Sequence, residues 1–182
     1  DVTTLGKIDI KGPDAAEFLN RVYTNAWMKL PVGKARYGLM LREDGIVMDD
    51  GTTTRISENH YHMTTTTAQA ANVLSHLEYY LQIVWPELNV NVVSTTEQWA
   101  GAAIAGPKSR DMLSKLYPDL DVSNDALPFM GYKEAEFFGV PSRIFRISFS
   151  GELAYEINVK SDHGMFMWEK MMEVGKEFGN QP

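Results

Sequence analysis

An internal repeat constrains the fold of this chain more than any other feature of its sequence. Residues 8–23 align without a gap on residues 102–117, and each copy carries an alternating strand pattern that runs into a Gly-Pro pair. Proline is accepted in the first turn of a helix because its missing N–H costs no hydrogen bond there. The repeat therefore predicts two strand–turn–helix units. The positions identical in the two copies include Gly12/Gly106, Pro13/Pro107, Leu19/Leu113 and Tyr23/Tyr117.

The order of elements repeats as well. Each copy continues with a hairpin (about 36–55 and 132–149), a strand (about 60–66 and 154–159) and an amphipathic helix (about 67–84 and 161–178). Only the first copy closes with a strand, at 90–93; the second has residues 179–182 at that place. We expect an α+β fold with two pseudo-repeated halves, about 1–97 and 98–182, and mixed or antiparallel sheets.

The second helix of the first copy has an apolar stripe that predicts its buried side. Thr67 begins this helix, and Ser161 and Asp162 begin its counterpart, so these residues are expected N-caps. The apolar stripe consists of Ala70, Val73, Leu74, Leu77, Leu81 and Val84.

Composition excludes several classes of protein. The 182 residues contain 44% apolar residues, enough for one domain with an ordinary core, but no run approaches the roughly 18 apolar residues of a membrane helix. A net charge of −7 disfavours a nucleic-acid surface, and the absence of cysteine excludes thiolate chemistry and fits the cytoplasm. No glycine-rich dinucleotide fingerprint follows a strand, so we expect no nicotinamide or flavin bound by this chain alone. Because it begins with Asp1 rather than Met, we interpret it as a piece of a longer protein.

The most informative short motif is DGIVMDD, residues 44–50. An Asp-Gly pair between two apolar runs predicts a hairpin, because Gly45 accepts the positive φ of a primed turn. Asp49 and Asp50 then lie on a strand, where aspartate is rare, so they either mark the exit into solvent or serve chemistry. Adjacent strand side chains point to opposite faces, so only one of them can face a pocket. Asp49 shares its face with Arg55, a candidate surface partner.

Three further places are candidates on weaker grounds. Thr64 and Thr66 share one face of a strand end and can offer hydroxyls to a ligand, although β-branched residues also simply suit strands. Glu156 lies within a strand, where it either faces water or a cleft between the two halves. His60 and His62 share a strand face, but no further ligand falls at metal-binding spacing. No metal is expected.

Several spaced motifs together resemble the glycine-cleavage T-protein superfamily of tetrahydrofolate-binding domains. They are residues 4–21, residues 35–40 with the 44–51 hairpin, and residues 149–157. Within this superfamily the chain is most similar to the sarcosine oxidase alpha-subunit branch, through the stretches 4–8, 20–25, 63–67, 95–100 and 151–153. The resemblance implies ferredoxin-like halves around a folate pocket, normally followed by a small β-barrel that is absent from residues 1–182.

The resemblance also implies roles for particular residues. The acid beside the reactive folate nitrogens falls on Asp50, which leaves Asp49 as a solvated surface acid, and the glutamate that holds the pteridine falls on Glu156. The pocket tyrosine falls on Tyr37 and a small apolar wall on Leu5. Two positions depart from the T-protein pattern, because Thr66 replaces an asparagine and Phe149 a tyrosine; the pterin contacts there are expected to differ.

The function implied by this resemblance is transfer of the one-carbon unit of oxidised sarcosine to tetrahydrofolate, giving the methylene form. Flavin and NAD are expected only in other parts of the parent enzyme, and the other oxidase subunits are the expected partners. Two alternatives remain open: an aminomethyltransferase that works with a lipoyl carrier protein, and a non-catalytic folate-sensing or assembly module. The Ser-Gly-Glu-Leu stretch at 150–153 argues against the aminomethyltransferase.

Overall fold

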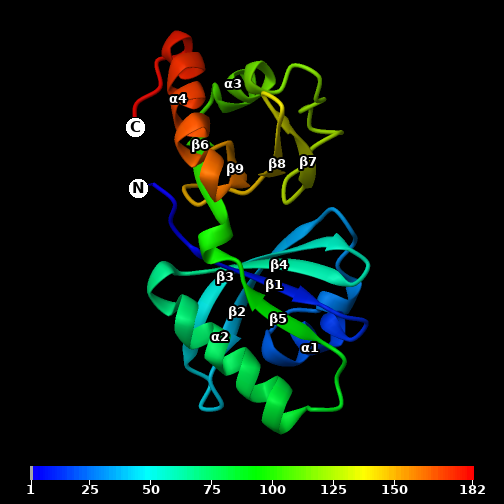
Figure 1. Ribbon diagram of the computed structural model, residues 1–182. Coiled ribbons are helices and arrows are strands. Elements are labelled where there is room, and N and C mark those ends of the chain that lie inside the picture. The colour runs from blue at the N-terminus through cyan, green and yellow to red at the C-terminus, as the bar shows by residue number, and fades with distance from the viewer. Residues whose placement is uncertain (1) are drawn as a thin grey trace. The chain divides into compact units, whose positions relative to one another are not determined.

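The computed structural model describes residues 2–182; Asp1 lies outside the described residues (Figure 1). The chain divides into two compact units. The first is Thr4–Thr96, and the second combines 97–182 with the described residues before Thr4. Each unit contains one antiparallel sheet and two α-helices.

The sheet of the first unit has the order β2-β3-β4-β1-β5. Its strands are β1 (Gly6–Lys11), β2 (Ala35–Leu41), β3 (Val47–Ser57), β4 (His60–Thr65) and β5 (Asn91–Ser94). The helices are α1 (Ala15–Val22) and α2 (Ala70–Tyr79). Short helical turns flank them: η1 (Trp27–Lys29), η2 (Thr67–Gln69), and the π-helical η3 (Tyr80–Val84). Another turn, η4 (Thr96–Gln98), follows β5.

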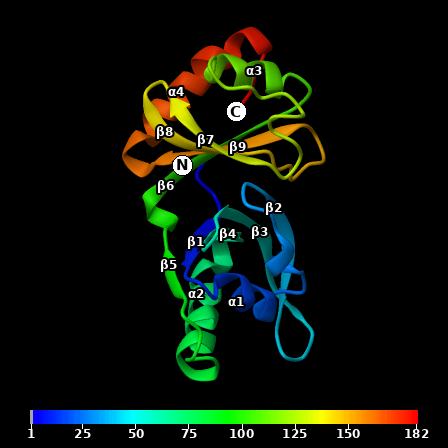
Figure 2. The same ribbon diagram turned by 90° about the vertical axis from the view of Figure 1, so that its right-hand side faces the viewer.

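Alternation along the strands gives this sheet one apolar and one polar face. In β1, Ile8 and Ile10 are fully buried in the core with residues of α1 and α2, so both helices cover the same face (Figure 2). Lys7 and Asp9 lie on the other face, because consecutive strand residues point to opposite sides. The core side chains include Phe18, Leu19, Met40, Tyr61, Met63, Val73 and Leu77.

The sheet of the second unit has the order β6-β9-β8-β7. Its strands are β6 (Trp99–Ala105), β7 (Tyr132–Phe137), β8 (Val140–Phe145) and β9 (Ala154–Lys160). The helices α3 (Ser109–Leu116) and α4 (Gly164–Gly175) lie on one side of it (Figure 2), with turns η5 (Ser161–His163) and η6 (Lys176–Phe178) flanking α4. Tyr155, Ile157 and Val159 of β9 are fully buried against these helices.

The same succession of elements occurs in both units. The order β2-β3-β4-β1 corresponds to β7-β8-β9-β6, and β1 has a further neighbour, β5. In both β1 and β6, a threonine hydroxyl accepts a hydrogen bond from a backbone N–H of the strand. Thr96 Oγ1 accepts from the N–H of Lys7 at 3.0 Å, and Thr3 Oγ1 accepts from the N–H of Gly101 at 3.1 Å.

Several local predictions about the helix ends are wrong. Pro13 and Pro107 each precede the N-cap residue rather than occupying the first turn, because α1 begins at Ala15 and α3 at Ser109. Neither Thr67 nor the 161–162 pair caps a helix by a side-chain hydrogen bond. Thr67 Oγ1 instead accepts from the N–H of Leu5, a strand-end contact that local sequence does not specify. Val84, placed in the apolar stripe, is 41% exposed because the helix ends in a π turn there.

Candidate functional site

The acid-bearing hairpin forms where the sequence predicts it. Gly45 adopts a φ of +80°, and the Arg42 N–H donates to the carbonyl of Ile46 at 2.9 Å, which closes the loop between β2 and β3. In the β2–β3 register Asp49 lies opposite Met40. Met40 is a core residue, so strand alternation places Asp49 on the helix-covered face and Asp50 on the opposite, polar face.

Asp50 and Tyr37 form a pair on the polar face. The Tyr37 hydroxyl donates to Asp50 Oδ2 at 2.8 Å, and Tyr37 itself is 48% exposed. This hydrogen bond raises the pKa of Tyr37, because deprotonating the phenol would lose the bond and place two negative charges side by side. The phenol thus remains a donor to a half-buried carboxylate that is also accessible to a ligand.

Asp49 is not the solvated surface acid that the sequence suggested, and this prediction is corrected. It is only 6% exposed, and its carboxylate accepts from Thr66 Oγ1 at 2.8 Å and from the Thr66 N–H at 3.2 Å. Burial raises the pKa of Asp49, an effect that the bonds from Thr66 oppose. Arg55, its expected partner, instead binds Glu58 and the carbonyl of Leu30. The hydrogen-bond donors to Asp49 thus come from Thr66, just after β4, and not from Arg55.

Thr64 and Thr66 use their hydroxyls differently, although both were expected to offer them to a ligand. Thr64 Oγ1 lies 3.1 Å from Thr52 Oγ1 and accepts from the Thr52 N–H at 3.1 Å. Thr66 is bonded to Asp49. Gly51 allows this close approach of β3 to β4, because a Cβ there would lie 2.1 Å from the Thr64 carbonyl oxygen.

Leu5 has an unusual backbone conformation for a branched residue. Its φ is +74°, a left-handed value that residues other than glycine, asparagine and aspartate seldom adopt. Hydrogen bonds hold it there: its N–H donates to Thr67 Oγ1 at 3.1 Å, and its carbonyl accepts from Lys7 Nζ at 3.1 Å. Met130 and Phe138 also have a positive φ, so this conformation by itself does not distinguish Leu5 as a site residue.

A cluster that sequence reasoning did not assemble lies on the same polar face. Asp9 Oδ2 is 2.9 Å from His60 Nε2, and Asp9 Oδ1 is 2.7 Å from His62 Nδ1. The alternation of the histidines was visible in the sequence, but their partner follows only from the β1–β4 register, in which Asp9 faces His62. Among residues 2–182 no group of three or more histidine, aspartate or glutamate side chains suits a metal ion.

The two remaining candidates belong to the second unit. Glu156 is half-buried on β9 between Ala103 of β6 and Phe145 of β8, and it points away from the core formed by Tyr155 and Ile157. Phe149 is fully exposed in the loop between β8 and β9. The fold thus gives Glu156 a fixed place on a strand, whereas it leaves the ring of Phe149 in solvent.

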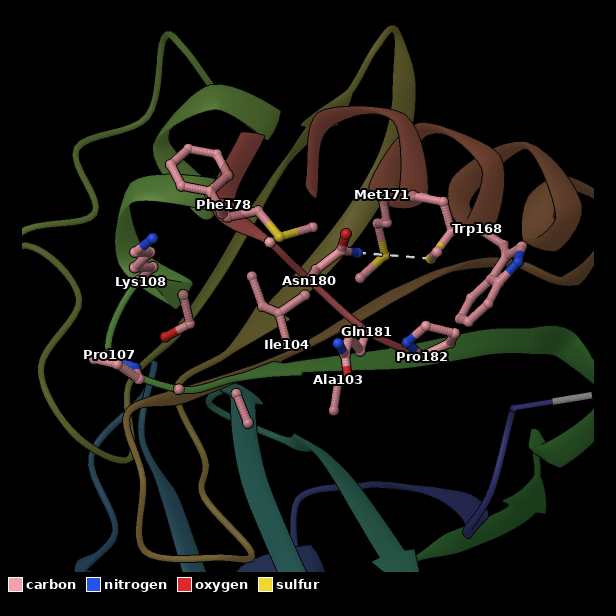
Figure 3. A pocket seen from close by; sticks show the side chains of 16 residues that line it. Ala103, Ile104, Pro107, Lys108, Trp168, Met171, Phe178, Asn180, Gln181 and Pro182 are labelled. Atoms are coloured by element: carbon pink, nitrogen blue, oxygen red, sulfur yellow. Dashed lines mark hydrogen bonds between the residues drawn. The ribbon is translucent and has the colours of Figure 1, made fainter. Parts of the chain in front are cut away.

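The second unit also contains an apolar groove, shown in Figure 3. It has a volume of about 470 Å³ and follows β6 beneath α4. The Asn180 amide reaches Met172 Sδ at 3.6 Å across it. None of the candidate residues lines this groove. Its walls include Ile104, Met112, Trp168, Met171, Phe178 and Pro182.

The fold is an α+β fold similar to that of aminomethyltransferases. The structure of glycine cleavage system aminomethyltransferase T from Bartonella henselae superposes with a TM-score of 0.80 at 24% identity, over 94% of this chain and 44% of that one. A chain of the heterotetrameric sarcosine oxidase from Corynebacterium sp. U-96, in complex with pyrrole 2-carboxylate, gives 0.71 at 12% identity over 100% and 84%. At these identities the similarity concerns the fold alone.

The family model of the GCVT N-terminal domain matches residues 1–182, and the chain belongs to this family. It is 57% identical to the sarcosine oxidase subunit alpha of Rhizobium meliloti (strain 1021), covering 100% of this chain and 18% of that protein. Identity to the aminomethyltransferase of Chloroherpeton thalassium is 31%, over 100% of this chain and 48% of that protein. The chain thus spans about a fifth of the alpha subunits and about half of the aminomethyltransferases. No helix among residues 2–182 has the length and apolar character needed to span a bilayer.

Proposed function

We propose that this chain is the tetrahydrofolate-binding domain of a sarcosine oxidase alpha subunit, and that it transfers the one-carbon unit of oxidised sarcosine to tetrahydrofolate. The observation that carries the proposal is the Tyr37–Asp50 pair, a carboxylate and a phenol 2.8 Å apart on the polar face of a sheet. The 52–57% identity to three such alpha subunits favours this function over that of the aminomethyltransferases, at 31–33%.

Asp50 supplies the acid–base chemistry in this proposal. The two amine nitrogens of reduced folate each bond to the carbon of the iminium or of formaldehyde and each lose a proton, and the two protons leave on the amine of the released glycine or as water. Asp50 accepts or steers a proton, and its negative charge stabilises the cationic imine; positioned acid–base groups contribute roughly 10²- to 10⁴-fold. The Tyr37 hydroxyl holds the carboxylate in place. The amine itself is oxidised at a flavin elsewhere in the parent enzyme.

Glu156 holds the pterin in this proposal. The pterin edge presents N–H groups, and a carboxylate fixed on a strand accepts them through charge-assisted hydrogen bonds. Leu5 supplies an apolar wall, and Thr64, Thr66 and Phe149 remain proposed neighbours of the ligand. The Thr64 and Thr66 hydroxyls already bond Thr52 and Asp49. We therefore propose that these two residues shape the pocket wall and do not donate hydrogen bonds to the folate.

The finer architecture belongs to the same proposal. We interpret the two units as pseudo-repeats of one ferredoxin-like plan within a single folate-binding domain, with the other subunits of the oxidase as its partners. The matching strand orders and the equivalent hydroxyl contacts of Thr3 and Thr96 support this interpretation.

Calorimetry with tetrahydrofolate on the complete protein that contains this chain tests the proposal. We expect binding by the wild type and a loss of affinity of about tenfold or more in Asp50→Ala and in Glu156→Ala, since each removes a charged partner. The conservative variant Asp44→Asn, at the exposed hairpin loop, serves as a control and should bind normally. Unchanged affinity in both test variants would place the site elsewhere.

A further inference from the structure

Asp49, the neighbour of the proposed catalytic acid, is buried rather than solvated. Its carboxylate is 6% exposed, and among residues 2–182 no ion pair reaches it. The titratable groups that interact with it electrostatically are Asp50, Tyr23 and Tyr37, none of which is cationic. A buried charge without a counter-ion costs stability, so Asp49 is poorly explained as a stabilising residue.

Thr66 is the group that Asp49 holds. Both the hydroxyl and the backbone N–H of Thr66 donate to the carboxylate, at 2.8 and 3.2 Å. Thr66 is the residue between the end of β4 and the helical turn η2, where the first N–H groups of a helix lack intrahelical acceptors. Asp49, on the neighbouring strand β3, therefore holds the junction between β4 and η2 in place.

This junction also determines the position of Leu5. The residue after Thr66 is Thr67, whose Oγ1 accepts from the N–H of Leu5 at 3.1 Å and so helps to hold Leu5 at its positive φ. Asp49 is thus connected to two residues of the proposed folate site, to Thr66 directly and to Leu5 through Thr67. Asp50, one position along β3, faces the opposite side of the sheet.

We propose that Asp49 is a positioning residue of the folate site, which holds Thr66, and through it Leu5, where the ligand binds. This inference rests on the function proposed above. It assigns the two carboxylates of the hairpin different tasks: Asp50 meets the ligand, and Asp49 acts from the buried side of the same strand without touching the ligand.

Four variants of the complete protein test this inference. Asp49→Asn keeps the shape but turns one acceptor into a donor that opposes the Thr66 N–H, and Thr66→Val removes the hydroxyl without changing the volume. For each of these two we expect the dissociation constant of tetrahydrofolate, measured by calorimetry, to rise about tenfold, the effect of one or two lost hydrogen bonds to a charged group. Thr66→Ser restores the hydroxyl and should bind like the wild type, as should the surface control Asp44→Asn.

A second readout separates positioning from general damage. In Thr66→Val the KM for folate should rise, whereas the turnover number at saturating folate should change less than about twofold. The reason is that a weaker site is still filled at saturating folate, and the catalytic Asp50 is unchanged. If Asp49→Asn does not fold, Thr66→Val and Thr66→Ser still decide the matter. Wild-type affinity in Thr66→Val, or equal losses in Thr66→Val and Thr66→Ser, would overturn the inference. If Asp50→Ala weakens binding and Asp49→Asn does not, this inference fails alone; if the wild type does not bind, the proposed function fails too.

Discussion

Substituting Gly51 by alanine tests the close approach of β3 and β4 on which the geometry of the site depends. A Cβ at this position would lie 2.1 Å from the carbonyl oxygen of Thr64 and 2.9 Å from its carbonyl carbon. Ordinary contacts begin near 3.4 Å, so one of the strands must move by about 1 Å. The contacted atoms belong to the backbone of a paired strand and cannot rotate away as the end of a side chain can.

The expected cost follows from that displacement. Overpacking of this kind costs about 1–3 kcal/mol, and the backbone contact favours the upper half of this range. In a chain of this size each kcal/mol lowers the melting temperature by about 2–4 °C, so Gly51→Ala should melt roughly 4–12 °C below the wild type. Circular dichroism during heating measures this, and calorimetry should show weaker folate binding because Asp50 precedes Gly51 in the chain.

Gly45→Ala is the matched control in the same hairpin. A Cβ at Gly45 has no atom within 4 Å, so its cost is limited to the strain of a φ of +80°. We expect this variant to lose some stability but to bind folate like the wild type. A Gly51→Ala variant that melts within about 2 °C of the wild type and binds folate normally would refute the described approach of β3 to Thr64.

Three further predictions concern the titration and strain of the site. Asp50→Asn should lower the pKa of Tyr37 toward its ordinary value of 10.0, seen as an earlier rise in tyrosinate absorbance on alkaline titration; an unchanged curve would contradict the Tyr37–Asp50 bond. The pKa of Asp49 in the folded state lies above its ordinary value of 3.8, so the folded state binds this proton more tightly than the unfolded state does. Lowering the pH from above the folded-state pKa toward 3.8 should therefore raise the unfolding free energy of the wild type relative to that of Asp49→Asn. Urea unfolding at several pH values measures this difference, and a difference independent of pH would contradict the burial of Asp49. Leu5→Gly should relieve about 1 kcal/mol of left-handed strain, giving an unfolding free energy equal to or above that of the wild type, with weaker folate binding; a clear loss of stability in urea would contradict the strain.

Short-range patterns were enough to predict much of the fold. The Gly12-Pro13 repeat indicated two strand–helix units, and the alternation and stripe patterns predicted the hairpin, the paired strands and the helices α2 and α4. These features depend on neighbours within a few residues, so the sequence carries them directly. The α+β class with antiparallel sheets is confirmed.

Contacts between distant segments were not predictable in the same way. Asp49 was assigned to the surface because the resemblance gave the functional role to Asp50, and Arg55 was its candidate partner, whereas its true partner Thr66 lies 17 residues further on. The Asp9 contacts with His60 and His62 likewise depend on pairing across 51 and 53 residues. Both cases turn on the register of strands that are distant in sequence, which alternation alone does not determine.

The most direct test of the proposed function is the fate of the one-carbon unit during sarcosine oxidation by the complete enzyme. With tetrahydrofolate and a formaldehyde scavenger in solution, the wild type should yield methylene-tetrahydrofolate. Asp50→Asn should oxidise sarcosine at nearly the wild-type rate but deliver the carbon to the scavenger, because transfer loses its acid–base group while the flavin chemistry takes place elsewhere. Unchanged formation of methylene-tetrahydrofolate by Asp50→Asn would contradict the role assigned to this carboxylate.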